Sequence, residues 1–135
     1  MVEDMLEDVK TRLKSLGISV SSEPNSQDEL LLNFCIIKVI NHVNNQTNLS
    51  EIPQGLHEIA VDMVVGEFLY SKKSMGALSI DSLDFDLIAK QVQDGDTNTV
   101  FAIEANSTPE AQFNAFIAYL QHNEVDFVRY RVMLW

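Results

Sequence analysis

The residues of this 135-residue chain that could support catalysis or metal binding are few, and they lie far apart in the sequence. The three histidines, His42, His57 and His122, fall on three different predicted helices. A metal site or a base–nucleophile pair needs several such groups to converge, and no spacing here brings them together. His57-Glu58 resembles the start of a zinc-binding helix, but the second histidine four residues later is missing. We therefore predict surface or helix-end histidines and no metal site.

Two further candidates for chemistry are a thiol and an acidic turn. Cys35 is the single cysteine and lies in an apolar helical segment, where burial makes a thiol unreactive. Asp94-Gly-Asp96 begins like a calcium loop, but Thr99 and Ala105 stand where the loop needs glycine and glutamate. The five glycines are scattered singly, so no phosphate-binding loop is present. The sequence predicts no catalytic residue, no cofactor and no enzymatic activity.

The carboxylate of Glu67 falls on an apolar face of its predicted helix, where an unpaired charge would be costly. One interpretation is a carboxylate near the helix end that reaches solvent or pairs with a lysine. The other is a buried ion pair between two subunits. The sequence favours the first interpretation and leaves the second open.

The charge balance restricts the class of partner. Twenty acidic and nine basic side chains give a formal charge of −11, which disfavours tight binding to nucleic acid and to anionic membranes. No apolar run approaches the roughly 20 residues that a membrane span requires. The acidic start, MVEDMLEDVK, does not resemble a signal peptide, and one cysteine agrees with a reducing compartment.

Hydrophobic spacing predicts an all-α fold, a small bundle of four to five helices. The first helix spans residues 2–16 and stops at Gly17, which suits a helix end. The second opens with a capping box at 26–29 and continues to about residue 44. The third starts near Pro53 and ends near Lys73. The last follows a second capping box, Ser107–Glu110, and runs to about Asn123.

The segment between the third and last helices is predicted to be a long loop or a β-hairpin. Asp94-Gly95 between two β-tolerant runs is a strong hairpin signal, although residues 87–101 also allow a helix. After the last helix, DFVRYRVMLW alternates apolar and basic groups and is predicted to be extended. We accordingly divide the chain into a helical domain, 1–126, and a C-terminal docking tail, 127–135.

Two helices have more apolar surface than one stripe. The second helix is apolar nearly all round, which predicts a place in the middle of the bundle. The third has one stripe along Leu56 and Met63 and an opposite stripe formed by Val61, Val65, Phe68 and Leu69. Gly66, in the middle of that helix, suggests that another backbone passes close to it.

Either the other helices of the same chain or a neighbouring copy must cover the second stripe of the third helix. The tail favours the copy, because aromatic residues and arginine are typical of interfaces. We therefore predict a subunit interface at the second stripe and a docking role for the tail, in particular for Phe127, Arg129, Tyr130, Arg131 and Trp135. A final strand folded onto its own domain remains the alternative.

Several stretches together resemble the head–tail connector (adaptor) proteins of tailed bacteriophages and related prophages. The resemblance covers almost the whole chain and includes LEDVKTRLKSLGI, QVQDGDTNTVF and the final YRVMLW. Its most distinctive pieces are Ile52-Pro53-x-Gly55-Leu56, the Ala60–Lys73 helix and the Gly95-Asp96-Thr97 turn. No catalytic signature is involved.

The resemblance implies a structural virion protein at the portal vertex, assembled in the host cytoplasm. Such proteins form a ring, typically twelvefold, beneath the portal protein, extend the DNA channel and contact the next neck or tail-completion protein. The C-terminal segment would bind the portal. A monomeric state of the isolated subunit would be consistent with this role. DNA would pass without specific binding, and Asp94 and Asp96 are candidates for channel-facing acids. No membrane partner is implied.

Two other functions fit the sequence. One is a different phage neck or tail-completion protein, which would associate with a tail-terminator ring rather than with the portal. The other is an acidic helical regulatory adaptor that sequesters a basic partner. Binding by such an adaptor should collapse with added salt, whereas a docked apolar tail should tolerate salt.

Overall fold

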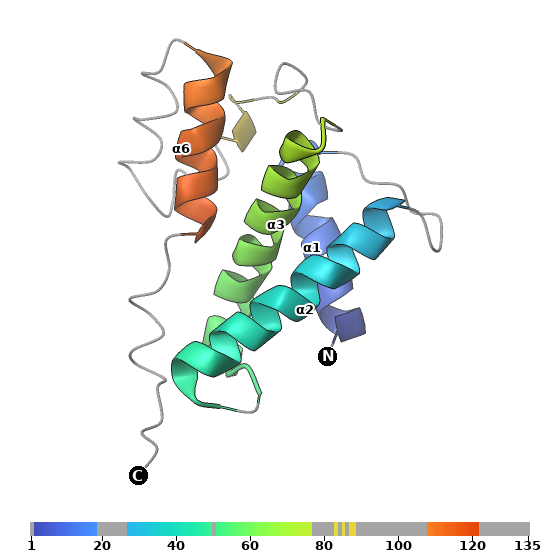
Figure 1. Ribbon diagram of the computed structural model, residues 1–135, viewed down its shortest axis with the longest axis vertical. Coiled ribbons are helices and arrows are strands. Elements are labelled where there is room, and N and C mark those ends of the chain that lie inside the picture. Colours follow the sequence, from blue (N-terminus) through green and yellow to red (C-terminus); the bar gives the residue numbers. More distant parts are fainter. Residues whose placement is uncertain are drawn as a thin grey trace.

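The computed structural model describes residues 2–18, 27–49, 51–76, 83, 85, 87–88 and 108–121, which form a small all-α bundle (Figure 1). The predicted fold class is therefore confirmed. Four α-helices and one short 3₁₀ helix occur in this described part. None of its helices is both long enough and apolar enough to cross a membrane.

Helix α1, Val2–Ser15, begins the bundle and ends as the sequence predicts. Gly17 has a positive φ of 78°, which glycine adopts without strain. The amide of Gly17 donates to the Lys14 carbonyl, and the amide of Ile18 donates to the Leu13 carbonyl. This pair of bonds is a Schellman motif, which satisfies carbonyls that the helix end leaves unpaired.

Helix α2, Gln27–Thr47, is longer than predicted and buries one face. The buried side chains are Leu32, Cys35, Ile36, Val39, Val43 and Thr47. At the end of the helix the Thr47 hydroxyl donates to the Val43 carbonyl, and Asn48 has a positive φ of 58°. Asparagine is one of the few residues other than glycine that tolerate this conformation. The helix therefore stops three residues beyond the predicted end.

Helix α3, His57–Ser74, is the central helix of the bundle, and the 3₁₀ helix η1, Gln54–Leu56, leads into it. It contacts α1, α2 and α6, the helix Pro109–Gln121. Figure 1 shows α3 between α6 on one side and α1 and α2 on the other. The prediction that the second helix occupies the middle is wrong, because the third helix has the larger number of packed neighbours along its length.

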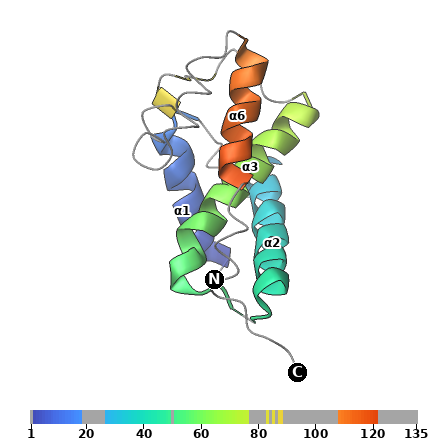
Figure 2. The same ribbon diagram turned by 90° about the vertical axis from the view of Figure 1, so that its left-hand side faces the viewer.

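Helix α6 packs along α3, and Figure 2 shows it in front of α3. Its N-terminal cap is Thr108, whose hydroxyl accepts from the amide of Ala111 at 3.2 Å. Pro109 occupies the first helical position, where it is well tolerated. The predicted cap residue, Ser107, is therefore displaced by one position.

The described residues between α3 and α6 differ from the predicted loop. Phe85, Leu87 and Ile88 have helical conformation, and Ile88 is fully buried. A Cβ on Gly17 would lie 2.9 Å from Leu87 Cδ2, so this segment packs against the end of α1. Leu87 and Ile88, at the start of the 87–101 segment, are helical, and the choice between hairpin and helix for the rest of the segment stays a prediction. Residues 89–107, with the predicted Asp94-Gly95 turn, lie outside the described residues.

The core contains side chains from all four helices, packed around α3. Its largest fully buried members include Phe68 of α3 and Phe113 and Phe116 of α6. α1 contributes Met5, Val9, Leu13 and Leu16 at helical spacing. Burial at this spacing is what an amphipathic helix in a bundle requires.

Candidate interaction surface

The stripe predicted to form a subunit interface is buried inside its own chain. Val65, Phe68 and Leu69 are at most 1% exposed, and Val61 is 7% exposed. Side chains that are already enclosed cannot present a surface to a neighbouring copy. The prediction of a subunit interface at these four residues is therefore wrong.

Gly66 marks the close approach of α6 to α3. A Cβ at this position would lie 3.1 Å from Leu120 Cβ and 2.6 Å from Gln121 Nε2. The Gln121 side chain also donates a hydrogen bond to the Met63 carbonyl at 3.2 Å. The sequence predicts that another backbone passes close to Gly66, and the nearest atoms belong to the side chains of Leu120 and Gln121 on α6 of the same chain.

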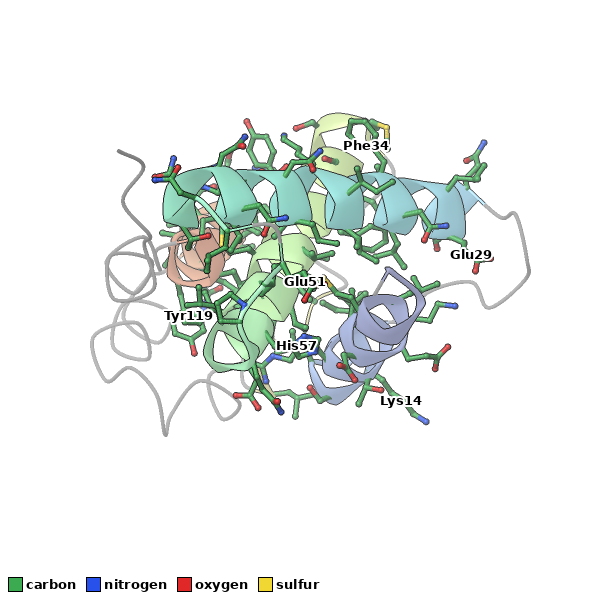
Figure 3. All side chains as sticks on the ribbon, turned by 90° about the horizontal axis from the view of Figure 1, so that it is seen from below. Lys14, Glu29, Phe34, Glu51, His57 and Tyr119 are labelled. Carbon is green, nitrogen blue, oxygen red and sulfur yellow. The ribbon has the colours of Figure 1, made fainter. Side chains whose placement is uncertain are left out.

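The outward face of α2 is the largest apolar feature left exposed on any single described helix. Leu30, Phe34 and Ile37 are 56%, 66% and 51% exposed. Their spacing of four and three residues places them on one stripe. Figure 3 shows Phe34 on the side of α2 away from α1. We call these three residues the α2 face.

The C-terminal half of α3 adds two more exposed apolar side chains. Tyr70 is 58% exposed, and Met75, just after the helix, is 64% exposed. Single exposed apolar residues are ordinary on protein surfaces, whereas a continuous stripe is a sign of a binding surface. The α2 face is such a stripe.

Two ion pairs tie α2 to α3 in an antiparallel arrangement. Lys72 Nζ lies 2.8 Å from Asp28 Oδ1, and Lys38 Nζ lies 3.1 Å from Glu67 Oε2. The favoured interpretation of Glu67, a carboxylate paired with a lysine, is confirmed. Because both acids are paired, the border between α2 and α3 has little net charge.

A notch of about 240 Å³ lies where α2, α3 and α6 meet. Its lining residues are Lys38, Val39, His42, Met63, Glu67 and Gln121. The Lys38–Glu67 pair and the Gln121 hydrogen bond use polar groups of this lining internally. The notch is therefore a junction between three helices in which Lys38 and Glu67 pair with each other.

Cys35 behaves as an inert core thiol. It is 1% exposed, and burial, together with the nearby Glu67 carboxylate, raises its pKa to about 11. The Lys38 ammonium partly opposes this rise. Because the thiolate is the reactive form, the thiol stays protonated and unreactive at neutral pH. The predicted burial of Cys35 is confirmed.

The histidines do not converge in the described part of the chain. His57 starts α3, and its Nε2 lies 2.6 Å from Asp8 Oδ2 of α1. His42 lies in the notch on α2, and His122 is outside the described residues. No group of three or more histidine, cysteine, aspartate or glutamate side chains within the described ranges could hold a metal ion.

A partly buried ion pair joins α1 to α3. The Arg12 guanidinium Nε donates to Asp62 Oδ1 at 2.9 Å. Burial raises the pKa of the Asp62 carboxyl, and the adjacent Arg12 charge and hydrogen bond offset part of this rise. Desolvation therefore outweighs the attraction between the two groups.

Several predicted site residues lie outside the described residues. These are the candidate channel acids Asp94 and Asp96 and the whole docking tail, Phe127, Arg129, Tyr130, Arg131 and Trp135 included. Their roles remain predictions.

The apolar pattern all round the second helix predicts a central position, whereas Leu30, Phe34 and Ile37 of this helix are exposed. The polar residues Asn33, Lys38 and Asn41 beside them were the signal of an outer face. Comparison with family models, with curated proteins and with solved structures finds no match to this chain.

Proposed function

We propose that this protein is a structural component of a tailed-phage virion, a head–tail connector that forms a ring under the portal. In this role it extends the DNA channel and links the capsid to the neck or tail. The proposal rests on the sequence resemblance and on the physical character of the bundle. It needs no cofactor and no chemical step.

The observation that supports an assembly role best is the α2 face. Its three large apolar side chains are each more than half exposed. A protein partner that binds this face would remove their apolar surface from water. Burial of such area is favourable by about 25 cal/mol per Å². A connector subunit needs a surface of this kind, since it functions through contacts with other proteins.

The strong negative charge is compatible with a conduit for DNA. At a formal charge of −11, the chain repels the phosphate backbone at short range, so DNA can pass without adhering. Screening limits this repulsion to about 10 Å at ordinary salt, so acids that line the channel would matter most. Asp94 and Asp96 stay our candidates for such positions.

The tail provides the portal contact in this proposal. Residues 127–135 combine aromatic and aliphatic side chains with Arg129 and Arg131, a composition typical of interface anchors. A tail of this kind would bind by adding its backbone to the portal and placing its apolar groups in pockets. We place the protein at the portal vertex of the virion and in the host cytoplasm during assembly.

The test is co-purification with the portal protein of the same genome, for the full chain and for a chain lacking residues 127–135. We expect the full chain to bind the portal ring and the shortened chain to lose binding while keeping its helical circular dichroism. Binding of the full chain to a tail-terminator ring and not to the portal would favour a different neck protein. Binding that collapses with moderate salt would favour a regulatory adaptor.

A further inference from the structure

We propose that Lys72 and Lys73, at the end of α3, form a two-armed ionic clasp whose arm on α6 opens with salt while its arm on α2 stays closed. Added salt then loosens the first turn of α6 and leaves the packing of α1, α2 and α3 in place. The inference concerns the bundle itself and does not depend on the proposed function.

Three helix ends meet at the two lysines. Lys72 and Lys73 lie in the last turn of α3, where positive charge is favourable. Asp28 lies in the first turn of α2 and Glu110 in the first turn of α6, where negative charge is favourable. Successive residues of a helix point in directions about 100° apart. Each lysine therefore pairs with a carboxylate of a different helix.

The arm on α2 is short and largely shielded from water. Lys72 Nζ lies 2.8 Å from Asp28 Oδ1, and the two side chains are 17% and 20% exposed. The same ammonium lies 5.4 Å from the centre of the ring of Phe68, which is buried in the core. Salt screens partly buried pairs much less than exposed ones. We therefore expect this arm to persist as the salt concentration rises.

The arm on α6 is longer and more exposed. Lys73 Nζ lies 3.5 Å from Glu110 Oε1, and the Glu110 side chain is 72% exposed. The Lys73 ammonium also lies 5.1 Å from the centre of the Phe113 ring. Exposed ion pairs stabilise weakly and are screened by salt. This arm is therefore the one that salt opens.

The opposite end of α6 is held by neutral contacts. Gln121 Nε2 donates to the Met63 carbonyl at 3.2 Å, and Leu120 is fully buried beside Gly66. Ionic screening acts on charges and leaves contacts of this kind in place. The two ends of α6 therefore differ in their response to salt, and the helix loosens from its first turn.

The test is amide hydrogen exchange of the full chain, measured by NMR at constant pH in about 50 mM and about 500 mM sodium chloride. The Gln112 amide, which donates to the Thr108 carbonyl at 3.1 Å, reports on the first turn of α6. Leu120 reports on the last turn of α6, and Leu32 reports on the start of α2. We expect exchange at Gln112 to be about two- to fivefold faster at the higher salt concentration, with little change at Leu120 and Leu32.

Two variants remove the arm on α6 from opposite sides. Lys73→Gln and Glu110→Gln should each speed exchange at Gln112 in low salt and abolish its salt response. Lys14→Gln, at an exposed position of α1, loses the same charge as Lys73→Gln and should behave as the unmodified chain. The inference is overturned if Gln112 does not respond to salt in the unmodified chain, or if Lys73→Gln keeps the response. An equal response at Leu120 would overturn it as well.

Discussion

Helices α2 and α3 have similar apolar content but opposite fates in the bundle. On α3, both stripes are buried, because α1 and α2 pack on one side and α6 packs on the other. On α2, one face is buried and the opposite face stays in water. Phe68 and Phe34 show the contrast, since the first is 1% exposed and the second 66% exposed. The number of packed neighbours, more than the helical pattern, decides which apolar residues become core.

The largest expected effect comes from truncating the two phenylalanines in turn. Phe68→Ala should lower the free energy of unfolding by about 3–5 kcal/mol, because it leaves a cavity beside α3. Phe34→Ala should change it by about 0.5 kcal/mol or less, since an exposed side chain loses little on removal. Urea denaturation followed by circular dichroism measures both. Similar losses in the free energy of unfolding for the two variants would contradict the assignment of Phe68 to the core and Phe34 to the surface.

A smaller effect is expected where α6 approaches α3. Gly66→Ala gains about 1 kcal/mol of helix propensity but places a Cβ 3.1 Å from Leu120 Cβ, and overpacking costs about 1–3 kcal/mol. We expect a net loss of about 1 kcal/mol in urea denaturation. The control is Asn41→Ala, at an exposed position of α2. This change also gains helix propensity but causes no clash, so it should raise the free energy of unfolding slightly. A stabilising Gly66→Ala would show that α6 does not pack tightly on α3.

The cap of α6 offers a test of similar size. Thr108→Ala removes the hydroxyl that accepts from the Ala111 amide, and loss of such a cap costs about 1 kcal/mol. Ser107→Ala should cost less, because the structure assigns the cap to Thr108. Thermal denaturation of the two variants decides between them. A larger loss of stability for Ser107→Ala than for Thr108→Ala would indicate that Ser107 is the cap, as the sequence predicts.

The smallest expected effect is the pH dependence of the α1–α3 ion pair. Burial raises the pKa of Asp62, so the folded state holds this proton at a higher pH than the unfolded state. The stability gained from protonation is complete below the ordinary value of 3.8 and is lost as pH rises through the raised pKa.

We therefore expect the stability of the unmodified chain, relative to Asp62→Asn, to decrease as pH rises across this range. Urea titrations of both proteins at a series of acidic pH values provide the measurement. A relative stability that increases with pH would mean that the Arg12 attraction outweighs desolvation.

Much of the bundle could be predicted because its signals are local. Helix spacing, Gly17 and Pro109 act within a few residues, so the four helices fall close to their expected bounds. The pairing of Glu67 with a lysine and the burial of Cys35 also follow from the apolar surroundings of each residue. These features depend little on how the helices are arranged.

The arrangement itself could not be predicted, because it depends on contacts between distant segments. The spacing of Val65 and Phe68 on α3 does not reveal which other helices of the chain bury them. Likewise, Leu30 and Ile37 have a pattern typical of core, although no described helix packs over them. The sequence therefore predicts an interaction surface on α3, whereas the exposed apolar face lies on α2.

The central claim is that the α2 face is open to solvent in the folded chain, whereas the second stripe of α3 is enclosed. Thiol labelling at position 34, in a Phe34→Cys chain that also has Cys35→Ala, tests it most directly. We predict rapid labelling at position 34 and slow labelling of the buried native Cys35 in the unmodified chain. Slow labelling at position 34 in the folded chain would contradict the claim.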